Sequence, residues 1–266
     1  MRHFTIAVLA ALVLCVAGLA ASASPAAAQL YAADGGRAAG SLYRINPLTG
    51  AASVVGTIED SVGEGYAVGG MAFDGEGTLY AITTVGWAQS EIETELLTIN
   101  PATGEATLVA GTGQRSFAGD ITFIDGTLYS FFASGNCVIQ LGAINTTTGA
   151  VVCAGSAGAG GIVGGGLAYD ATGEKLYASL DGVDGDLRTL DPLDSSVDAT
   201  LSLDGVGGMY TGGQAIGALT YYNGTLYGIR KARGDDVVHL VTIDTTTGAV
   251  EIVGMLPPGV DALVGR

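Results

Sequence analysis

The chain has 266 residues, of which 48% are hydrophobic, and this apolar content excludes an intrinsically disordered protein. Its 26 acidic residues outnumber the 10 lysines and arginines and give a net charge of −16, which argues against nucleic acid as a partner. The 44 glycines argue against a helical protein and favour a β protein rich in turns.

The first 28 residues have the pattern of a secretory signal peptide. Met1 to His3 form a short basic start, Ile6 to Ala21 are apolar, and residues 24–28 are a small-residue segment of the A-x-A type. We expect cleavage after Ala28 and a mature protein that is secreted or periplasmic. The apolar run is near the lower limit for crossing a bilayer and no stop-transfer segment follows it, so we expect no membrane span.

The remaining residues, 29–266, are expected to form a single domain built from a repeat. A Leu-Tyr pair begins at residues 30, 79, 128, 176 and 226, so the copies are 48 to 50 residues apart. A turn sequence Asn/Asp-x-x-Thr-Gly follows the pairs at residues 46–50, 100–104, 145–149, 244–248 and, in a degenerate form, 191–195. A repeat of this length predicts a solenoid, a propeller or an array.

Each complete unit consists of four predicted strands. In the second unit, large and small residues alternate along 71–73 and 79–83, which predicts two strands with one packed face each. The Asp-Gly-Glu-Gly sequence at 74–77 supplies the turn between them. A third strand, a Pro-containing turn and a fourth strand follow within 97–109. Four-stranded units of this size are typical of propeller blades.

The two ends of the repeat predict how it closes. The first unit begins directly at Leu30-Tyr31 and lacks an inner strand, whereas residues 259–264 have the pattern of an inner strand with nothing after it. The two fragments make one blade. We therefore predict an all-β, five-bladed β-propeller of four-stranded blades, closed by N- and C-terminal segments that share one blade. The alternative is an open solenoid, and the leftover strand argues against it.

The repeat also resembles a known group of proteins. Residues 71–81 (MAFDGEGTLYA) and 97–109 (LTINPATGEATLV) resemble the repeats of secreted bacterial propellers of the broad NHL/YVTN-like type and of related domains of unknown function. The resemblance implies propeller architecture only, because such repeats occur in enzymes, adhesins and binding proteins alike. No catalytic motif accompanies it here.

The loops of the predicted propeller differ between its two faces. Loops between strands 1 and 2 and between strands 3 and 4 are short and uniform, whereas the remaining loops are longer and irregular and emerge together on the other face. Variable loops on a rigid frame are where binding sites usually lie. On that face we place seven candidate binding residues: Tyr66, Trp87, Arg115, Tyr210, Arg230, Lys231 and Arg233.

Two features among these candidates are distinctive, the tryptophan and the basic cluster. Trp87 is the only tryptophan and could stack on a sugar ring or anchor a protein partner, but it could equally fold over its own loop. Arg230, Lys231 and Arg233 form the only basic cluster of an acidic chain, which favours recognition of an anionic group or, more simply, a solvated loop.

Asp181, Asp184 and Asp186 place three carboxylates within six residues, an arrangement of oxygen ligands that could hold Ca²⁺. The segment lacks the full EF-hand spacing, and Asp-Gly pairs are common in turns. We therefore expect no cofactor, with Ca²⁺ as the one candidate.

Few residues support catalysis. Only His239 would remain after signal removal, so no His pair exists for a zinc site or a serine triad. Asp120 and Asp261 lie at the start of inner strands where other units carry Gly or Ala, and they are weak candidates for an acid and base pair or for a channel cation site. We expect a monomeric, non-catalytic binding scaffold for an unknown protein or glycan. The alternative is a carbohydrate-active hydrolase or a lectin that uses the mouth of the central channel.

The two cysteines after the signal could form a disulfide in an exported protein. In the predicted hairpin of 143–145 and 150–152, Cys153 lies opposite about Gly142, several residues from Cys137. This separation exceeds disulfide reach unless a bulge or bend intervenes, so a Cys137–Cys153 bond and two separate thiols both stay open.

Overall fold

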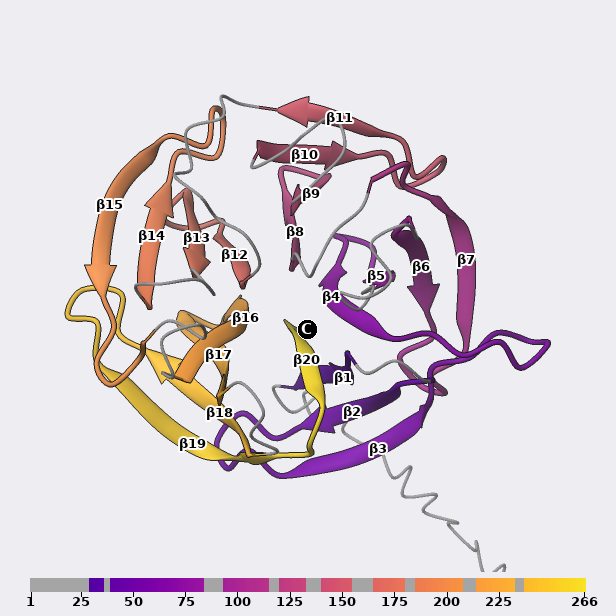
Figure 1. Cartoon of the computed structure of the whole chain (residues 1–266), viewed down its shortest axis with the longest axis horizontal. Coiled ribbons are helices and arrows are strands. Elements are labelled where there is room, and N and C mark those ends of the chain that lie inside the picture. The colour runs from indigo at the N-terminus through magenta and orange to yellow at the C-terminus, as the bar shows by residue number, and fades with distance from the viewer. Residues whose placement is uncertain are drawn as a thin grey trace, which may run out of the picture.

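The computed structural model describes residues 29–35, 39–83, 93–114, 120–132, 140–154, 165–179, 185–207, 214–232 and 237–266. The regular structure of these residues is entirely β, with twenty strands in five four-stranded antiparallel sheets. The sheets stand around one central axis like blades (Figure 1). The predicted five-bladed β-propeller is thus confirmed. Within the described ranges, no helix is long and apolar enough to cross a membrane.

We number the blades 1 to 5 and give the strands of each from the axis outwards. Blade 1 contains β20 (Val260–Gly265), β1 (Leu30–Asp34), β2 (Ser41–Ile45) and β3 (Ala52–Thr57). Blade 2 contains β4 (Val68–Phe73), β5 (Leu79–Thr83), β6 (Glu95–Ile99) and β7 (Ala106–Gly111). Blade 3 contains β8 (Ile121–Ile124), β9 (Thr127–Phe132), β10 (Gln140–Ile144) and β11 (Val151–Ala154). Blade 4 contains β12 (Leu167–Asp170), β13 (Lys175–Ser179), β14 (Asp186–Leu190) and β15 (Val197–Ser202). Blade 5 contains β16 (Gln214–Tyr222), β17 (Thr225–Ala232), β18 (Val238–Ile243) and β19 (Val250–Leu256).

Blade 1 closes the ring as the sequence predicted. Its inner strand β20 comes from the end of the chain and pairs antiparallel with β1, so that Leu263 lies opposite Ala32. Figure 1 shows β20 at the centre of the disc beside β1. An open solenoid is therefore excluded, because the first and last units share one sheet.

The Leu-Tyr pair owes its recurrence to packing between blades. The tyrosine of one blade meets the inner-strand aromatic residue of the next blade: Tyr31 meets Phe73 and Tyr80 meets Phe123, both edge-on with ring centroids 5.6 Å apart. Tyr177 and Tyr221 stack at 6.1 Å. Edge-on and offset ring pairs add to the stabilisation from apolar burial. These tyrosines therefore belong to the packed frame of the propeller.

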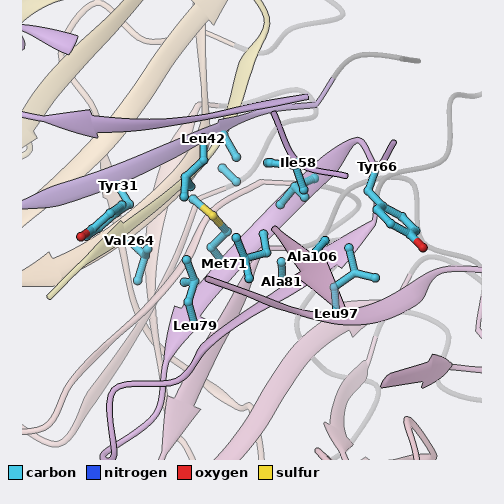
Figure 2. Packing of buried hydrophobic residues seen from close by; sticks show 14 residues of the cluster. Tyr31, Leu42, Ile58, Tyr66, Met71, Leu79, Ala81, Leu97, Ala106 and Val264 are labelled. Carbon is cyan, nitrogen blue, oxygen red and sulfur yellow. The ribbon is translucent and has the colours of Figure 1, made fainter. Parts of the chain in front are cut away.

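The core lies between neighbouring blades rather than in one central mass. Between blades 1 and 2, Leu42, Met71 and Leu79 are fully buried in one cluster with residues from β1, β5 and β20. Figure 2 shows these side chains interdigitating from several strands. Because every blade contributes to two such interfaces, the inner strands are held rigidly around the axis.

The Thr-Gly turns hold the blades together at the rim. All five turns between third and fourth strands have six residues, and an Asn or Asp side chain accepts backbone N–H groups within each, as Asn100 does from Ala102 at 2.9 Å. Gly104 has φ of +87°, and a Cβ there would lie 2.8 Å from the carbonyl oxygen of Thr57 in blade 1. The glycine therefore provides both the left-handed conformation and room for the preceding blade.

Candidate functional site

The two faces of the disc differ as predicted from the repeat. Connections between first and second and between third and fourth strands have two to six residues and define what we call the plain face. The other connections, on what we call the loop face, range from three residues at 257–259 to twelve at 155–166. Each blade therefore presents a different segment on the loop face, while the plain face repeats nearly the same turns.

The side chain of Asp120 lies between the inner strands at the axis of the disc, near the loop face. It directly precedes β8, and only 2% of its surface is exposed. Its carboxyl group accepts hydrogen bonds from the N–H groups of Ile121 at 3.0 Å, Leu167 at 3.3 Å and Leu219 at 2.9 Å. The N–H of Met71 contributes a fourth hydrogen bond. One side chain thus joins the inner strands of blades 2, 3, 4 and 5.

The reason for this arrangement is the unpaired inner edge of each blade. An inner strand has no neighbour on its axial side, and its backbone N–H groups need another acceptor. Asp120 provides that acceptor at a position where the aligned units carry Gly70, Gly166, Ala218 and Ala262. Burial raises the pKa of Asp120 well above its ordinary value, and the four amide hydrogen bonds oppose that rise.

Asp261 lies in a different environment. It is the second residue of β20 and forms an ion pair with Lys231 of β17, next to Gly217. Both side chains are about one fifth exposed, at 19% for Asp261 and 22% for Lys231. Asp120 and Asp261 both lie at the starts of inner strands, as predicted, but one binds backbone amides and the other a lysine.

The described part of the basic cluster is engaged within the protein. Lys231 is neutralised by Asp261, and Arg230 donates from Nη2 to the carbonyl oxygen of Gly205 at 2.6 Å. This bond ties β17 to the segment that follows β15. Recognition of an anionic ligand by these residues would have to compete with both contacts.

Tyr66 combines a structural ring with an acidic surrounding. Its side chain is 6% exposed and belongs to the cluster between blades 1 and 2. Figure 2 shows the tyrosine at the edge of this cluster, with its hydroxyl pointing away from the other labelled residues. Burial raises its pKa, and the charges of Glu64, Asp60 and Glu95 raise it further. Burial and Glu64 likewise raise the pKa of Glu95. The loop face is thus negatively charged beside Tyr66.

Asp34 is a further carboxylate of the loop face that sequence reasoning did not single out. Its Oδ2 accepts the N–H of Ser41 at 3.1 Å and the hydroxyl of Tyr43 at 3.3 Å, while its buried Oδ1 has no hydrogen-bond partner in the described ranges. Burial raises its pKa. The sequence held one signal, since Asp34 is the only acidic residue at this position of the five Leu-Tyr strands.

Of the three carboxylates in the calcium hypothesis, only Asp186 lies among the described residues. Asp186 accepts a hydrogen bond from the Ser202 hydroxyl at 3.1 Å, and Asp181 and Asp184 lie outside the described residues. Within the described ranges, no three His, Cys, Asp or Glu residues are grouped to hold a metal ion. Of the remaining candidates, Trp87, Arg115, Tyr210 and Arg233 also lie outside the described residues.

Cys153 is disulfide-bonded. It lies in the outer strand β11 opposite Gly142, as the sequence predicted. Its partner lies outside the described residues, as do Cys15 and Cys137, so the Cys137–Cys153 pairing stays a prediction.

A cavity of about 150 Å³ lies on the axis, where the sequence predicts a central channel. All five inner strands line it, from the level of Met71, Ile121, Leu167 and Leu219 to their plain-face ends. Near the plain-face end of the cavity, burial raises the pKa values of Tyr169 and Tyr221. The charge of Asp125 raises the pKa of Tyr169 further, and the charge of Asp170 raises the pKa of Tyr221 further. Arg266 lies 5.2 Å from the ring centroid of Phe73. In the sequence, Asp120 is the one polar residue among the aligned positions Gly70, Gly166, Ala218 and Ala262, which is why it was a candidate residue of this channel.

Comparison with known proteins supports the fold and assigns no family. No protein-family model matches the chain, and no curated protein matches it. A candidate 6-phosphogluconolactonase from Bacteroides fragilis has a similar structure, with a TM-score of 0.53 and 12% identity over 91% of this chain and 98% of that chain. A protein of unknown function from Bacteroides thetaiotaomicron has a TM-score of 0.50 and 18% identity over 77% of this chain and 54% of that chain. At such identities the likeness shows propeller-like structure and nothing about chemistry.

Proposed function

We propose that this protein is an exported, non-catalytic propeller of the NHL/YVTN-like type that binds a protein or glycan through its loop face. The observation that carries the proposal is the division of labour between the faces. The repeated turns between third and fourth strands pack against neighbouring blades, as Gly104 does on Thr57. On the loop face, connections of three to twelve residues differ from blade to blade.

A rigid frame with variable loops is suited to recognition. The packed interfaces between blades hold the strand ends in place, so a ligand need not order the frame when it binds. The loops can then vary without disturbing the fold, which is the usual location of binding residues in such scaffolds. Export follows from the signal-like segment 1–28, and cell fractionation of the full chain tests it.

The charges on the loop face favour a ligand with hydroxyl groups or positive charge. Asp34, Glu64 and Glu95 contribute carboxylates there, while the charge of Lys231 is used by Asp261. A glycan without acidic sugars or a basic protein segment would meet the least repulsion at this surface.

Catalysis by Asp120 and Asp261 receives less support. Asp120 is fully enclosed and bound to four backbone amides, which leaves it poorly placed to transfer a proton to a substrate. If these two aspartates catalysed hydrolysis, an Asp120→Asn, Asp261→Asn double variant would lose its hydrolase activity. Full activity in that variant would exclude them as the catalytic pair.

A glycan array and cell-surface extracts, probed with the purified mature protein, test the binding proposal. A Trp87→Ala, Arg233→Ala double variant, which changes two residues that the sequence predicts on the loop face, should bind at least about tenfold more weakly, since aromatic and arginine residues usually carry most of the affinity of an interface. The matched controls are Leu48→Ser and Leu193→Ser, which alter plain-face side chains that are 84% and 86% exposed. The proposal fails if both loop-face replacements leave binding intact or if the plain-face controls abolish it.

A further inference from the structure

The wall of the axial cavity is made of backbone. In an antiparallel strand pair, the N–H and C=O of one residue point to the same side. The N–H groups of Ile121, Leu167 and Leu219 point to the axis, because they bind Asp120. The carbonyl oxygens of these residues therefore face the axis as well. Met71 has the same geometry, since its N–H also binds Asp120.

These four carbonyl groups form a ring at the inner end of the cavity. All four residues line the cavity of about 150 Å³, and their carbonyl oxygens lie on the plain-face side of their amides. The ring thus lies directly below the Asp120 carboxyl group. Buried backbone carbonyl oxygens require a partner. The wall offers oxygen acceptors in the arrangement that a hard cation uses.

The charges around the cavity are mostly negative. Asp120 lies at its inner end, and its partners are the backbone amides of four strands, with no cationic side chain among them in the described ranges. Asp170 and Asp125 lie near Tyr221 and Tyr169 at the other end, with Arg266 on one side of that mouth over Phe73. A buried carboxylate without a counter-charge is costly, and a cation in the cavity would lower that cost.

We propose that the axial cavity binds one monovalent metal cation, Na⁺ or K⁺, through the carbonyl oxygens of Met71, Ile121, Leu167 and Leu219, with Asp120 as its counter-charge. A single carboxylate whose oxygens already accept amides balances one positive charge, whereas Ca²⁺ sites use several carboxylate oxygens directly. Water occupies about 30 Å³ per molecule, so the cavity has room for the ion and several waters. Those waters bridge the ion to the next backbone groups toward the plain face.

Thermal unfolding of the mature protein in KCl, NaCl and choline chloride at equal ionic strength tests the proposal. The melting temperature should rise in KCl or NaCl relative to choline, by about 5–10 °C at a hundredfold excess over the dissociation constant, and the rise should saturate. Equal melting temperatures in the three salts would overturn the proposal. A response to CaCl₂ without a response to Na⁺ or K⁺ would overturn the assignment to a monovalent ion.

The variant Asp120→Ala separates the cavity from general salt effects. Alanine is the residue at the aligned positions 218 and 262. This variant should lose the cation response, while Asp198→Ala, which removes an exposed carboxylate from the outer strand β15, should keep it. An undiminished response in Asp120→Ala contradicts the role of Asp120.

Crystallography gives a second measurement that does not depend on a variant. Crystals of the wild-type protein soaked in thallium(I) acetate should show an anomalous difference peak on the axis within the cavity, and excess K⁺ should displace it. Thallium peaks elsewhere with none in the cavity would overturn the proposal, even if Asp120→Ala fails to fold.

Discussion

The axis and the rim of the disc join neighbouring blades by opposite means. At the rim, a six-residue turn recurs in every blade, and in four of the blades its glycine packs against the backbone of the preceding blade. At Gly149, for example, a Cβ would lie 2.7 Å from the carbonyl oxygen of Gly111. At the axis, one residue that occurs once, Asp120, binds the inner strands of four blades. The rim shares the task among repeats, whereas the axis concentrates it in one side chain.

This difference predicts the largest effect for Asp120. Replacing it with alanine leaves the N–H groups of Leu167, Leu219 and Met71 without their acceptor, although water can enter and satisfy part of them. We expect Asp120→Ala to lower the free energy of unfolding by about 3–5 kcal/mol, measured by urea denaturation.

The control for that experiment is Asp261→Ala, at the start of another inner strand. Its ion pair with Lys231 is partly exposed, so its loss should cost only about 0–1 kcal/mol. Equal losses in the two variants would show that the axial hydrogen bonds contribute no more than an ordinary surface ion pair.

At the rim, Gly104→Ala should have the next largest effect. An alanine there would have to adopt φ of +87° with its Cβ 2.8 Å from the carbonyl oxygen of Thr57. We expect a loss of roughly 2–3 kcal/mol in urea denaturation. Gly75→Ala is the matched control, because a Cβ at Gly75 meets no atom within 4 Å and its φ lies outside the left-handed region. A similar loss in both variants would contradict the close contact between blades.

The protonation of Asp120 should give a pH dependence of unusual sign. Burial raises the pKa of Asp120 in the folded protein above that of the unfolded chain, so the folded state holds the proton more tightly. Stability from this group is therefore fully present below the unfolded pKa and is lost as pH rises through the folded pKa. The stability difference between wild type and Asp120→Asn, measured from pH 4 to pH 8 in choline chloride without Na⁺ or K⁺, should fall with rising pH. A difference that grows with pH would show that the amide hydrogen bonds outweigh burial.

The contrast between axis and rim also explains what the sequence could reveal. Repeated features could be predicted from the sequence. The Leu-Tyr strands and the Thr-Gly turns each occur in several copies, and the shared blade was indicated by an incomplete first unit and an extra strand at the end of the chain. Unique features were readable only as exceptions. Asp120 stood out against Gly70 and Ala218, but nothing in its neighbours indicated that its carboxyl group would meet the amides of Leu167 and Leu219.

Contacts between residues far apart in the chain account for the rest. The Asp261–Lys231 pair joins residues of two blades, and the axial cavity is walled by backbone whose direction appears only when five strands surround it. Asp34 was missed for a similar reason, because nothing in the sequence around Tyr43 indicated that its hydroxyl would donate a hydrogen bond to Asp34. The alignment of the units did contain a hint, because Asp34 is the only acidic residue at its position.

Blade 4 offers the smallest and most specific test of the rim. Its turn carries Ser195 where the other blades carry glycine, and this fully buried serine has φ of +59° and a hydroxyl with no hydrogen-bond partner in the described ranges. Restoring the repeat with Ser195→Gly should relieve that conformation and stabilise the protein by about 1 kcal/mol, measured as a rise in the urea midpoint. The neighbouring Ser196→Gly, at an exposed residue without positive φ, should instead destabilise by about 0.5–1 kcal/mol through chain entropy. If both changes destabilise the protein equally, the turn glycine is not required by the backbone conformation, and the rim must depend on the space between blades alone.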